Sequence, residues 1–335
     1  MTAPASLYPV PPGPVAHPAA SFASLPAVGC LQFEGPDTAA FLQGQLSNDI
    51  AALAIGDAQW TSYNSPKGRM LATMLLWRVT ATTFRALVAA DLAESLRKRL
   101  AMFVMRAKVI VTDHTPGSIR FGIAGPDAIP AVGAALGVAA SAGHGVTHDG
   151  CDVVTTPDGR VMVHAPVDAR DAIEHRLAAQ ATSMDASHWD WLAIAAGIPA
   201  IAAATQDLFI AQAANWDLVG GVSFRKGCYP GQEIIARMQY LGKLKERLVR
   251  LHHDGAPPAP ATHLYSAVFG DQACGTIVNA APAPGGGSDM LAVAQTSAAE
   301  DGTLHLGQPD GPALGLLALP YAVPAPVAPN RPKLA

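Results

Sequence analysis

The pattern of the chain changes at Gly242, and this change restricts the fold more than any other sequence feature. Before Gly242, alternating strand-like segments come between segments with helical periodicity. After it come short apolar runs separated by Gly- and Pro-rich turns, as in "LVRLHHDG" and "DMLAVAQT". Regular short strands of this kind are typical of a small closed or sandwiched β domain. The sequence therefore predicts an α+β region followed by an all-β domain.

Two segments of the α+β region follow one plan: a strand, then Gly-Pro-Asp, then a helix. The matching tetrapeptides are "EGPD" at 34–37 and "AGPD" at 124–127. We interpret them as two related α+β halves, with coincidence as the alternative because Gly-Pro-Asp is a common strand-to-helix turn. In the first copy, Asp37 is placed to cap a helix over "TAAFLQGQL". A hairpin is predicted with its turn at 157–159, "PDG".

These patterns divide the 335 residues into units. The predicted units are an irregular Pro/Ala-rich tail (1–25), two α+β subdomains (26–115 and 116–247), a β-barrel (248–323) and a second tail (324–335). Half of the residues are hydrophobic and 14% are charged, which indicates a compact protein. The net charge of −4 provides no general attraction to nucleic acid or anionic lipid. We therefore expect no direct nucleic-acid partner, and RNA contact only locally or through another protein.

The cysteines and the apolar segments limit the location of the protein. The four cysteines form no CxxC pair or Cys/His cluster, so neither a disulfide framework nor a self-contained metal site is expected. No Lys or Arg precedes Lys67, which argues against a secretory or mitochondrial leader. The longest apolar run, Trp191–Ala204, is interrupted by "GIP" and is too short for a membrane span. A soluble, cytoplasmic protein with no membrane partner is the prediction.

One cysteine lies in an unusual setting, the segment "FRKGCYPGQE" at 224–233. Residues 229–232, Tyr-Pro-Gly-Gln, fit a type II turn, and a helix "QEIIARMQYLG" follows, with Glu233 in its first turn and Gly242 ending it. Cys228 thus precedes a helix N-terminus and follows two cations, and both features favour the thiolate form. A buried, inert cysteine is the alternative.

The longer segment "NWDLVGGVSFRKGCYPGQEIIARMQ" resembles the signature of the YgfZ family of folate-binding, iron–sulfur-cluster-associated proteins, whose core reads K-G-C-Y-(T/P)-G-Q-E. Every position from Lys226 to Glu233 agrees with this core. Further segments of the resemblance are "GPDTAAFLQGQLSND", "SPKGRMLA", "FVMRAKV", "AGIP" and "LPYAV". The family is similar in fold to the glycine-cleavage T-protein, a tetrahydrofolate-dependent aminomethyltransferase. The resemblance implies an α+β, T-protein-like arrangement of three domains around a central folate channel, with a small C-terminal β-barrel.

The chain departs from the T-protein pattern at two segments. "SND", which contains Asp49, matches the T-protein's "TND". However, "TTPDGR" stands where that family has "GYTGE", and "WDWLAIAAGIP" stands where it has "RDxLRLEAG". The loss of the glutamate and the arginines argues against aminomethyl transfer, and whether the chain is an enzyme stays open.

The resemblance implies site residues as well. Cys228, with Lys226, is the expected functional thiol; it would supply one ligand to a cluster shared with a partner or react with an electrophile, and the sequence does not separate these two. The expected ligand is tetrahydrofolate or a derivative. Its candidate contacts are Asp49, Tyr229, Gln232, Glu233, Arg237 and Arg106. Asp49 is alternatively a turn residue and the cations are alternatively solvated. Trp189, Trp191 and Trp216 line the channel or belong to the core.

Three functions follow from these observations. The first is a folate-dependent factor that assembles or repairs iron–sulfur proteins, including enzymes that thiolate tRNA, with such proteins or cluster-assembly factors as partners. The second is a glycine-cleavage-type aminomethyltransferase or another tetrahydrofolate-dependent one-carbon transferase. The third is a non-catalytic folate-binding interaction protein in which Cys228 is structural.

Overall fold

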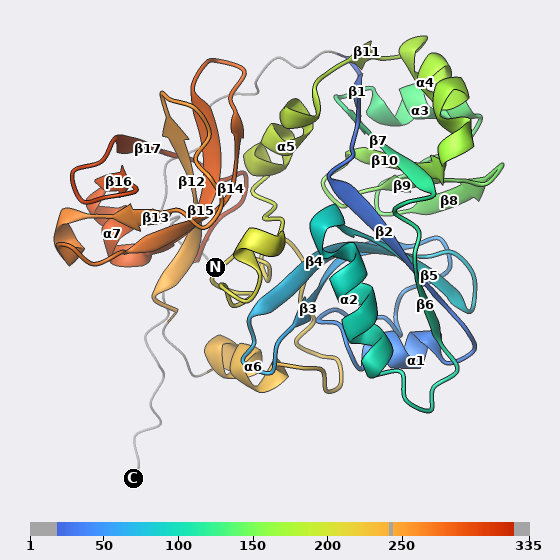
Figure 1. The fold of residues 1–335 in the computed structure, drawn as a ribbon, viewed down its shortest axis with the longest axis horizontal. Helices are drawn as coiled ribbons and strands as arrows, with labels where there is room; N and C mark the ends of the chain where they lie inside the picture. The colour runs from blue at the N-terminus through green and yellow to red at the C-terminus, as the bar shows by residue number, and fades with distance from the viewer. Residues whose placement is uncertain (1–18, 241–243, 325–335) are drawn as a thin grey trace, which may run out of the picture.

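The computed structural model describes residues 19–240 and 244–324. Figure 1 shows three units, two of mixed helix and sheet and one barrel. The α+β class and the closed C-terminal barrel predicted from the sequence are thereby confirmed. The predicted helix end at Gly242, residues 1–18 of the first tail and residues 325–335 of the second lie outside the described residues.

The first unit is a five-stranded antiparallel sheet with two helices. Across the sheet, its strands are β3 (Ala58–Asn64), β4 (Met70–Arg78), β5 (Thr83–Ala89), β2 (Val28–Glu34) and β6 (Ile110–Asp113), and its helices are α1 (Thr38–Gln43) and α2 (Ala90–Met102). Helix α2 contacts β2 and β6. It does so because Leu92, Leu96 and Leu100 recur at helical spacing and are buried on one side of the helix.

The second unit repeats this plan with an additional strand. Across its sheet, the strands are β8 (Gly145–His148), β9 (Cys151–Thr155), β10 (Val161–Pro166), β7 (Ser118–Ala124), β1 (Ser21–Ser24) and β11 (Thr182–Ser183), and its helical segments are α3 (Ala128–Leu136), η1 (Val167–Ala169) and α4 (Arg170–Ala178). The order β8-β9-β10-β7 corresponds to β3-β4-β5-β2 of the first unit. The turn predicted at 157–159 connects β9 to β10.

Strand β1 corrects the predicted extent of the N-terminal tail. The sequence places residues 1–25 in an irregular tail, but Ser21–Ser24 pair antiparallel with β7, and Ser21 and Phe22 also pair parallel with β11. β1 thus occupies the position beside β7 that β6 occupies beside β2. Four residues without a clear alternation become a strand because the neighbouring strands supply the hydrogen bonds, a contribution that local pattern does not contain.

The two Gly-Pro-Asp segments adopt the same backbone conformation. Gly35 and Gly125 both have positive φ, at 139° and 113°, and each turn leads from the end of a strand into a helix. Asp37, however, does not cap α1 with its side chain. Its Oδ2 instead accepts the backbone N–H of Lys108 at 2.7 Å, which ties the start of α1 to the segment before β6.

The third unit is a closed barrel. Around the barrel, its strands are β12 (Glu246–His253), β15 (Ser288–Gln295), β14 (Gly275–Pro282), β13 (His263–Tyr265), β16 (Leu304–Leu306) and β17 (Ala313–Leu317), and its helical segments are η3 (Ala267–Phe269) and α7 (Thr296–Asp301). The barrel closes where β12 pairs with β17, so none of its six strands has an unpaired edge.

A long connection joins the three units. It contains α5 (Ala186–Ala195), η2 (Ala203–Thr205) and α6 (Gln232–Tyr240). α5 contacts β1 of the second sheet and β14 and β15 of the barrel. The chain then returns to the first unit, where the N–H of Met70 donates to Phe209 O at 2.8 Å and the N–H of Ser223 donates to Ser47 O at 3.0 Å. The segment 224–233 therefore lies on the first unit, although the sequence places it in the second subdomain.

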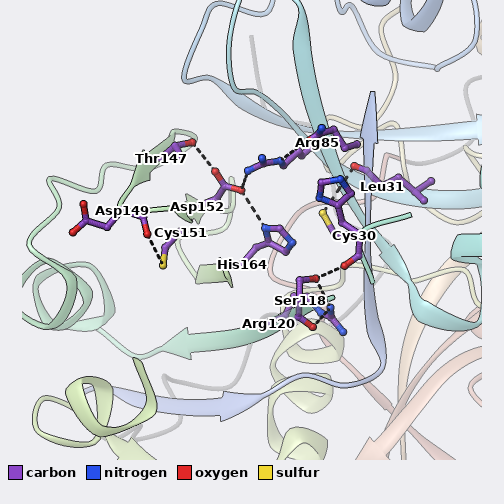
Figure 2. A network of polar contacts seen from close by, with 12 residues as sticks. Cys30, Leu31, Arg85, Ser118, Arg120, Thr147, Asp149, Cys151, Asp152 and His164 are labelled. Atoms are coloured by element: carbon purple, nitrogen blue, oxygen red, sulfur yellow. Dashed lines mark hydrogen bonds and ion pairs between the residues drawn. The ribbon is translucent and has the colours of Figure 1, made fainter. Parts of the chain in front are cut away.

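A buried polar network holds the two sheets together (Figure 2). Asp152 of β9 is fully buried and forms an ion pair with Arg85 of β5. The same carboxylate lies 3.2 Å from Nδ1 of His164 on β10, and its other oxygen accepts from Thr147 at 2.6 Å. Burial alone would raise the pKa of Asp152, but these hydrogen bonds and the Arg85 charge outweigh it and hold the pKa below its usual range.

Candidate functional site

The segment 224–233 has the turn and the helix that the sequence predicts. Gly231 has φ of 81°, and the N–H of Gln232 donates to Tyr229 O at 3.2 Å, which closes a turn around Pro230. Helix α6 begins at Gln232 and carries Glu233 in its first turn. Cys228 lies four positions before the helix and is exposed.

Lys226 fixes this segment to the first unit. The Lys226 side chain is buried, and its Nζ donates to Gln43 O, in the last residue of α1, at 2.6 Å and to Leu46 O just after the helix. Nζ also lies 4.9 Å from the centre of the Tyr229 ring. Burial lowers the pKa of Lys226 to about 8, and the nearby Asp49 carboxylate offsets part of this effect. A buried amine that titrates near neutral pH is available as a proton donor or acceptor.

Two glycines allow the motif turn to approach the β3–β4 hairpin. Gly68 in that hairpin has φ of 73°, and a Cβ on Gly231 would lie 2.6 Å from Gly68 Cα and from Ser65 O. A side chain at Gly231 would force the two turns apart, and a Cβ on Gly68 would lie 3.0 Å from the Ile234 side chain. The sequence "SPKG" of the hairpin and "YPGQ" of the motif are thus parts of one contact.

The four cysteines differ in accessibility. Burial raises the pKa of Cys30 to about 12, and it raises the pKa values of Cys151 and Cys274. Cys30 and Cys274 are buried and Cys151 is half-buried, whereas Cys228 is exposed. Within 19–240 and 244–324, no three His, Cys, Asp or Glu side chains come together as a metal site. The exposed Cys228 thiol is therefore positioned to react with an electrophile or to supply one ligand to a cluster shared with a second molecule.

The other predicted site residues lie close to this segment or on exposed surfaces. Asp49 Oδ1 accepts from Gln43 Nε2 at 3.1 Å and from the N–H of Ala52 at 3.3 Å, so it is a turn residue beside Lys226. Gln232 donates to Lys226 O at 3.3 Å. Glu233 and Arg237 are exposed on α6 and Arg106 is exposed after α2. The structure brings Asp49, Lys226, Tyr229 and Gln232 together, and Arg106 is not part of this group.

A separate cavity of about 340 Å³ lies where the three units meet. Its wall includes Trp60 from the first sheet, Arg160 from the second sheet, Trp189 from α5 and Asn279 from the barrel. Trp216 also lines the cavity, while Trp191 instead donates from Nε1 to Asp289 Oδ2 at 2.9 Å. Among the described residues, none of the folate contacts expected from the sequence lines this cavity.

Arg160 and Asp190 provide complementary charge on the cavity wall. Arg160 Nε donates to Asp158 Oδ2 at 2.6 Å, and its guanidinium lies 4.6 Å from the centre of the Trp189 ring. Its Nη1 is buried and has no hydrogen-bond partner in the part of the chain that the structure describes. Asp190 opens onto the cavity, and the surrounding protein atoms raise the pKa of its carboxyl, an effect that the Arg160 charge partly offsets.

Sequence reasoning missed Arg160 and Asp190 as candidates, although it singled out the segments that contain them. Arg160 belongs to "TTPDGR" and Asp190 to "WDWLAIAAGIP", the two departures from the T-protein pattern. Both segments line the same cavity. Their spatial proximity was the missing information, because 30 residues separate them in the chain. Trp189 reaches the cavity because Gly122 leaves room: a Cβ there would lie 2.5 Å from the Trp189 ring.

Comparison with known proteins identifies the family. The chain is 31% identical over 321 residues to tRNA-modifying protein YgfZ of Sodalis glossinidius, covering 93% of this chain and 96% of the relative. It is 30% identical over 298 residues to the protein of the same name from Yersinia pestis, covering 86% and 88%. The chain belongs to the YgfZ family. No family model matches it.

The fold of this YgfZ-family protein resembles that of a T-protein. The glycine cleavage system aminomethyltransferase T of Bartonella henselae superposes with a TM-score of 0.71, over 90% of this chain and 86% of that one, at 15% sequence identity. This likeness confirms the predicted T-protein-like fold. No helix among residues 19–240 and 244–324 is long and apolar enough to cross a membrane.

Proposed function

We propose that this YgfZ-family protein binds tetrahydrofolate or a derivative in the central cavity and supports assembly or repair of iron–sulfur proteins through Cys228. Among the proteins it would support are enzymes that thiolate tRNA, and its partners would be such proteins or cluster-assembly factors. The observation that carries the folate part is the cavity wall, which combines the indole rings of Trp60 and Trp189 with the guanidinium of Arg160 and the carboxyl of Asp190.

The cavity fits the chemistry of a reduced pterin. A pterin has an edge with both a carbonyl acceptor and N–H donors, and a flat face. The Arg160 guanidinium on the cavity wall is the donor for the carbonyl, Asp190 is able to accept from the N–H groups, and Trp189 and Trp60 are the aromatic residues of the wall. When bound, the folate would supply a carrier for one-carbon groups.

Two other polar side chains of the cavity wall already have partners. Asn279 exchanges two hydrogen bonds of 2.8 Å with the backbone of Ala200, and Thr73 Oγ1 accepts the N–H of Ile201 at 3.0 Å. These residues shape the wall. Recognition therefore depends on Arg160 and Asp190.

Calorimetry with tetrahydrofolate tests the folate part. We expect saturable binding to the wild type, and about tenfold weaker binding to Arg160→Met and Asp190→Asn, since each removes one charge-assisted hydrogen bond. Asp49→Asn is the matched control, because Asp49 is the folate contact implied by the family pattern yet is placed beside Lys226. Loss of binding in Asp49→Asn, with Arg160→Met unaffected, would move the folate site to the motif segment.

Complementation of a strain that lacks this function tests the thiol part. We expect Cys228→Ser to fail and Cys151→Ser to succeed, because Cys228 is exposed on the motif segment and Cys151 is not part of it. Full rescue by Cys228→Ser would favour the folate-binding interaction protein as the function.

Aminomethyl transfer is the alternative function, because the fold resembles that of an aminomethyltransferase. The two segments in which T-protein residues are replaced both line the cavity, so we expect no methylene-tetrahydrofolate from aminomethylated carrier protein. Robust formation of that product would establish the transferase instead.

A further inference from the structure

The end of α2 and the loop that follows it expose several large apolar side chains. Met102, Phe103 and Met105 are 69%, 46% and 87% exposed. Met105 also has φ of 47°, a left-handed conformation that is unfavourable for a side chain of this kind. Exposed apolar residues are ordinary when scattered singly, whereas a group of this size is typical of an interaction surface.

Cations flank this apolar group in the chain. Arg99, Arg106 and Lys108 are exposed, and Arg225 of the motif segment is exposed as well. None of the four forms an ion pair with a carboxylate within the ranges that the structure describes. On the same helix as Arg99, by contrast, Lys98 pairs with Glu94 at 3.1 Å. Arg106, Lys108 and Arg225 are thus free to meet an acidic partner, whereas the Arg99 guanidinium lies 5.9 Å from the centre of the Tyr63 ring.

The loop and the motif segment lie on either side of α1. Lys108 N–H donates to Asp37 Oδ2 at 2.7 Å beside the start of α1, and Lys226 Nζ donates to Gln43 O at 2.6 Å at its end. Because α1 has only six residues, it spans about 9 Å. Figure 1 shows α1 and the end of α2 at the same end of the molecule. We name this surface, from Arg99 to Lys108 and from Arg225 to Cys228, the α1 face.

We propose that the α1 face is a docking surface for a protein partner that presents acidic and apolar side chains. Docking there would bring the partner against the Cys228 thiol; this last point rests on the proposed function, whereas the docking surface does not. Exposed methionines suit the purpose because their flexible side chains adapt to different partner surfaces.

Other occupants fit the charges less well. A second copy of this chain in a two-fold interface would set the same cations against one another, which is repulsive. The net charge of −4 works against long-range attraction to RNA or anionic lipid, both of which carry extended negative charge. A protein partner needs to complement the α1 face only locally.

Fluorescence anisotropy with a defined probe tests the proposal. The probe is a fluorescein-labelled peptide of glutamate, leucine and phenylalanine, and the same peptide with lysine in place of glutamate is its control. We expect saturable binding of the acidic peptide that weakens with salt, and no binding of the lysine peptide. Met105→Asp and Arg106→Glu should each weaken binding about tenfold, because each alters the centre of the surface.

Two control variants test whether the loss of peptide binding depends on where the new charge is placed. Val268→Asp places the same aspartate at an exposed apolar position on the barrel, and Lys98→Glu changes the net charge as Arg106→Glu does. Both should bind the peptide within about twofold of the wild type. Failure of the acidic peptide to bind, or equal loss in the Val268→Asp and Met105→Asp variants, overturns the proposal. The proposal is also overturned if poly(U) RNA or phosphatidylglycerol vesicles bind in place of the peptide and if that binding is lost in Arg106→Glu.

Complementation distinguishes the docking surface from the thiol function. We expect Met105→Asp to reduce complementation while its tetrahydrofolate binding and Cys228 labelling stay at wild-type levels. If Cys228→Ser complements while the peptide assay gives the expected results, the thiol function falls and the docking surface stands. If Met105→Asp both binds the peptide and complements as the wild type does, the docking surface falls.

Discussion

Cys228 and Lys226 lie two positions apart and have opposite environments. The Cys228 thiol is exposed, while the Lys226 amine is buried against the end of α1. The Lys226 amine is directed at Gln43 O and Leu46 O, whereas the next two residues, Gly227 and Cys228, are exposed. At the residue scale, the motif combines a buried anchor with a surface thiol.

Labelling with iodoacetamide at neutral pH should modify Cys228 first. Burial raises the pKa values of Cys30, Cys151 and Cys274, so their thiolate fractions and their access to reagent are both small. Mass spectrometry of each cysteine over time gives the four rates. Equal rates for Cys228 and Cys151 would show that the surface position gives the thiol no advantage.

Lys226 should make stability rise with pH above about 8. Its folded pKa of about 8 lies below the ~10.4 of a free lysine, so the unfolded chain binds more protons between these values. The free energy of unfolding therefore increases with pH in that window, by up to about 1.4 kcal/mol per unit. Below pH 8 this contribution is constant. Urea unfolding of the wild type and Lys226→Met at pH 7.5, 8.5 and 9.5 measures this contribution. The difference between their free energies of unfolding should grow with pH.

The Lys226→Met variant has a second expected effect. It leaves the carbonyls of Gln43 and Leu46 without their donor, which should cost about 1–3 kcal/mol at pH 7.5. The measurements stay below pH 10, because burial raises the pKa of Tyr229 to about 12 and its ionisation affects stability in the opposite direction. A pH-independent difference would mean that the buried amine titrates as a free one.

At the scale of elements, the motif turn and the β3–β4 hairpin form one contact. Each turn has a glycine with positive φ, and the two backbones touch at Gly231 and Gly68. The contact orients α6 and, with Lys226, holds Cys228 at the surface. The close approach of the two turns requires glycine at position 231.

Gly231→Ala should destabilise the protein by about 2 kcal/mol or more, since its Cβ meets Gly68 and Ser65 and its φ is left-handed. Gly227→Ala, in the same segment, is the control, because a Cβ at Gly227 has no neighbour within 4 Å. Thermal unfolding of the two variants gives the comparison. Similar melting temperatures for both would contradict the close approach.

At the scale of the whole molecule, the buried network around Asp152 joins the two sheets. It links β5 of the first unit to β9 and β10 of the second (Figure 2). The cavity lies between these units and the barrel, so its shape depends on the relative placement that the network fixes. Removing one charge leaves the partner charges buried without compensation.

Asp152→Asn should lower the free energy of unfolding by about 3 kcal/mol at pH 7. The folded pKa of Asp152 is depressed, so its stabilising contribution is present above the unfolded value of ~3.9 and is lost as pH falls through the lower folded value. The wild type should therefore lose stability on acidification more steeply than the variant. Asp149→Asn, in the exposed turn between β8 and β9, is the control and should behave as the wild type.

The sequence by itself determined the features that depend on neighbours along the chain. The turn at Pro230 and Gly231, the hairpin turn at 157–159 and the paired Gly-Pro-Asp turns all follow from local backbone preferences, which act within a few residues. The all-β region after α6 was predictable for the same reason. The family could be predicted because its signature is a contiguous segment that contains Cys228.

Only the tertiary structure decided what happens where distant segments meet. Ser21–Ser24 became a strand because β7 and β11 offered partners, and Asp37 binds Lys108 instead of capping its own helix. Arg160 and Asp190 share a cavity because the β9–β10 hairpin and α5 pack against each other. Hydrogen-bond partners and packing of this kind depend on distance in space, which short-range sequence patterns do not encode.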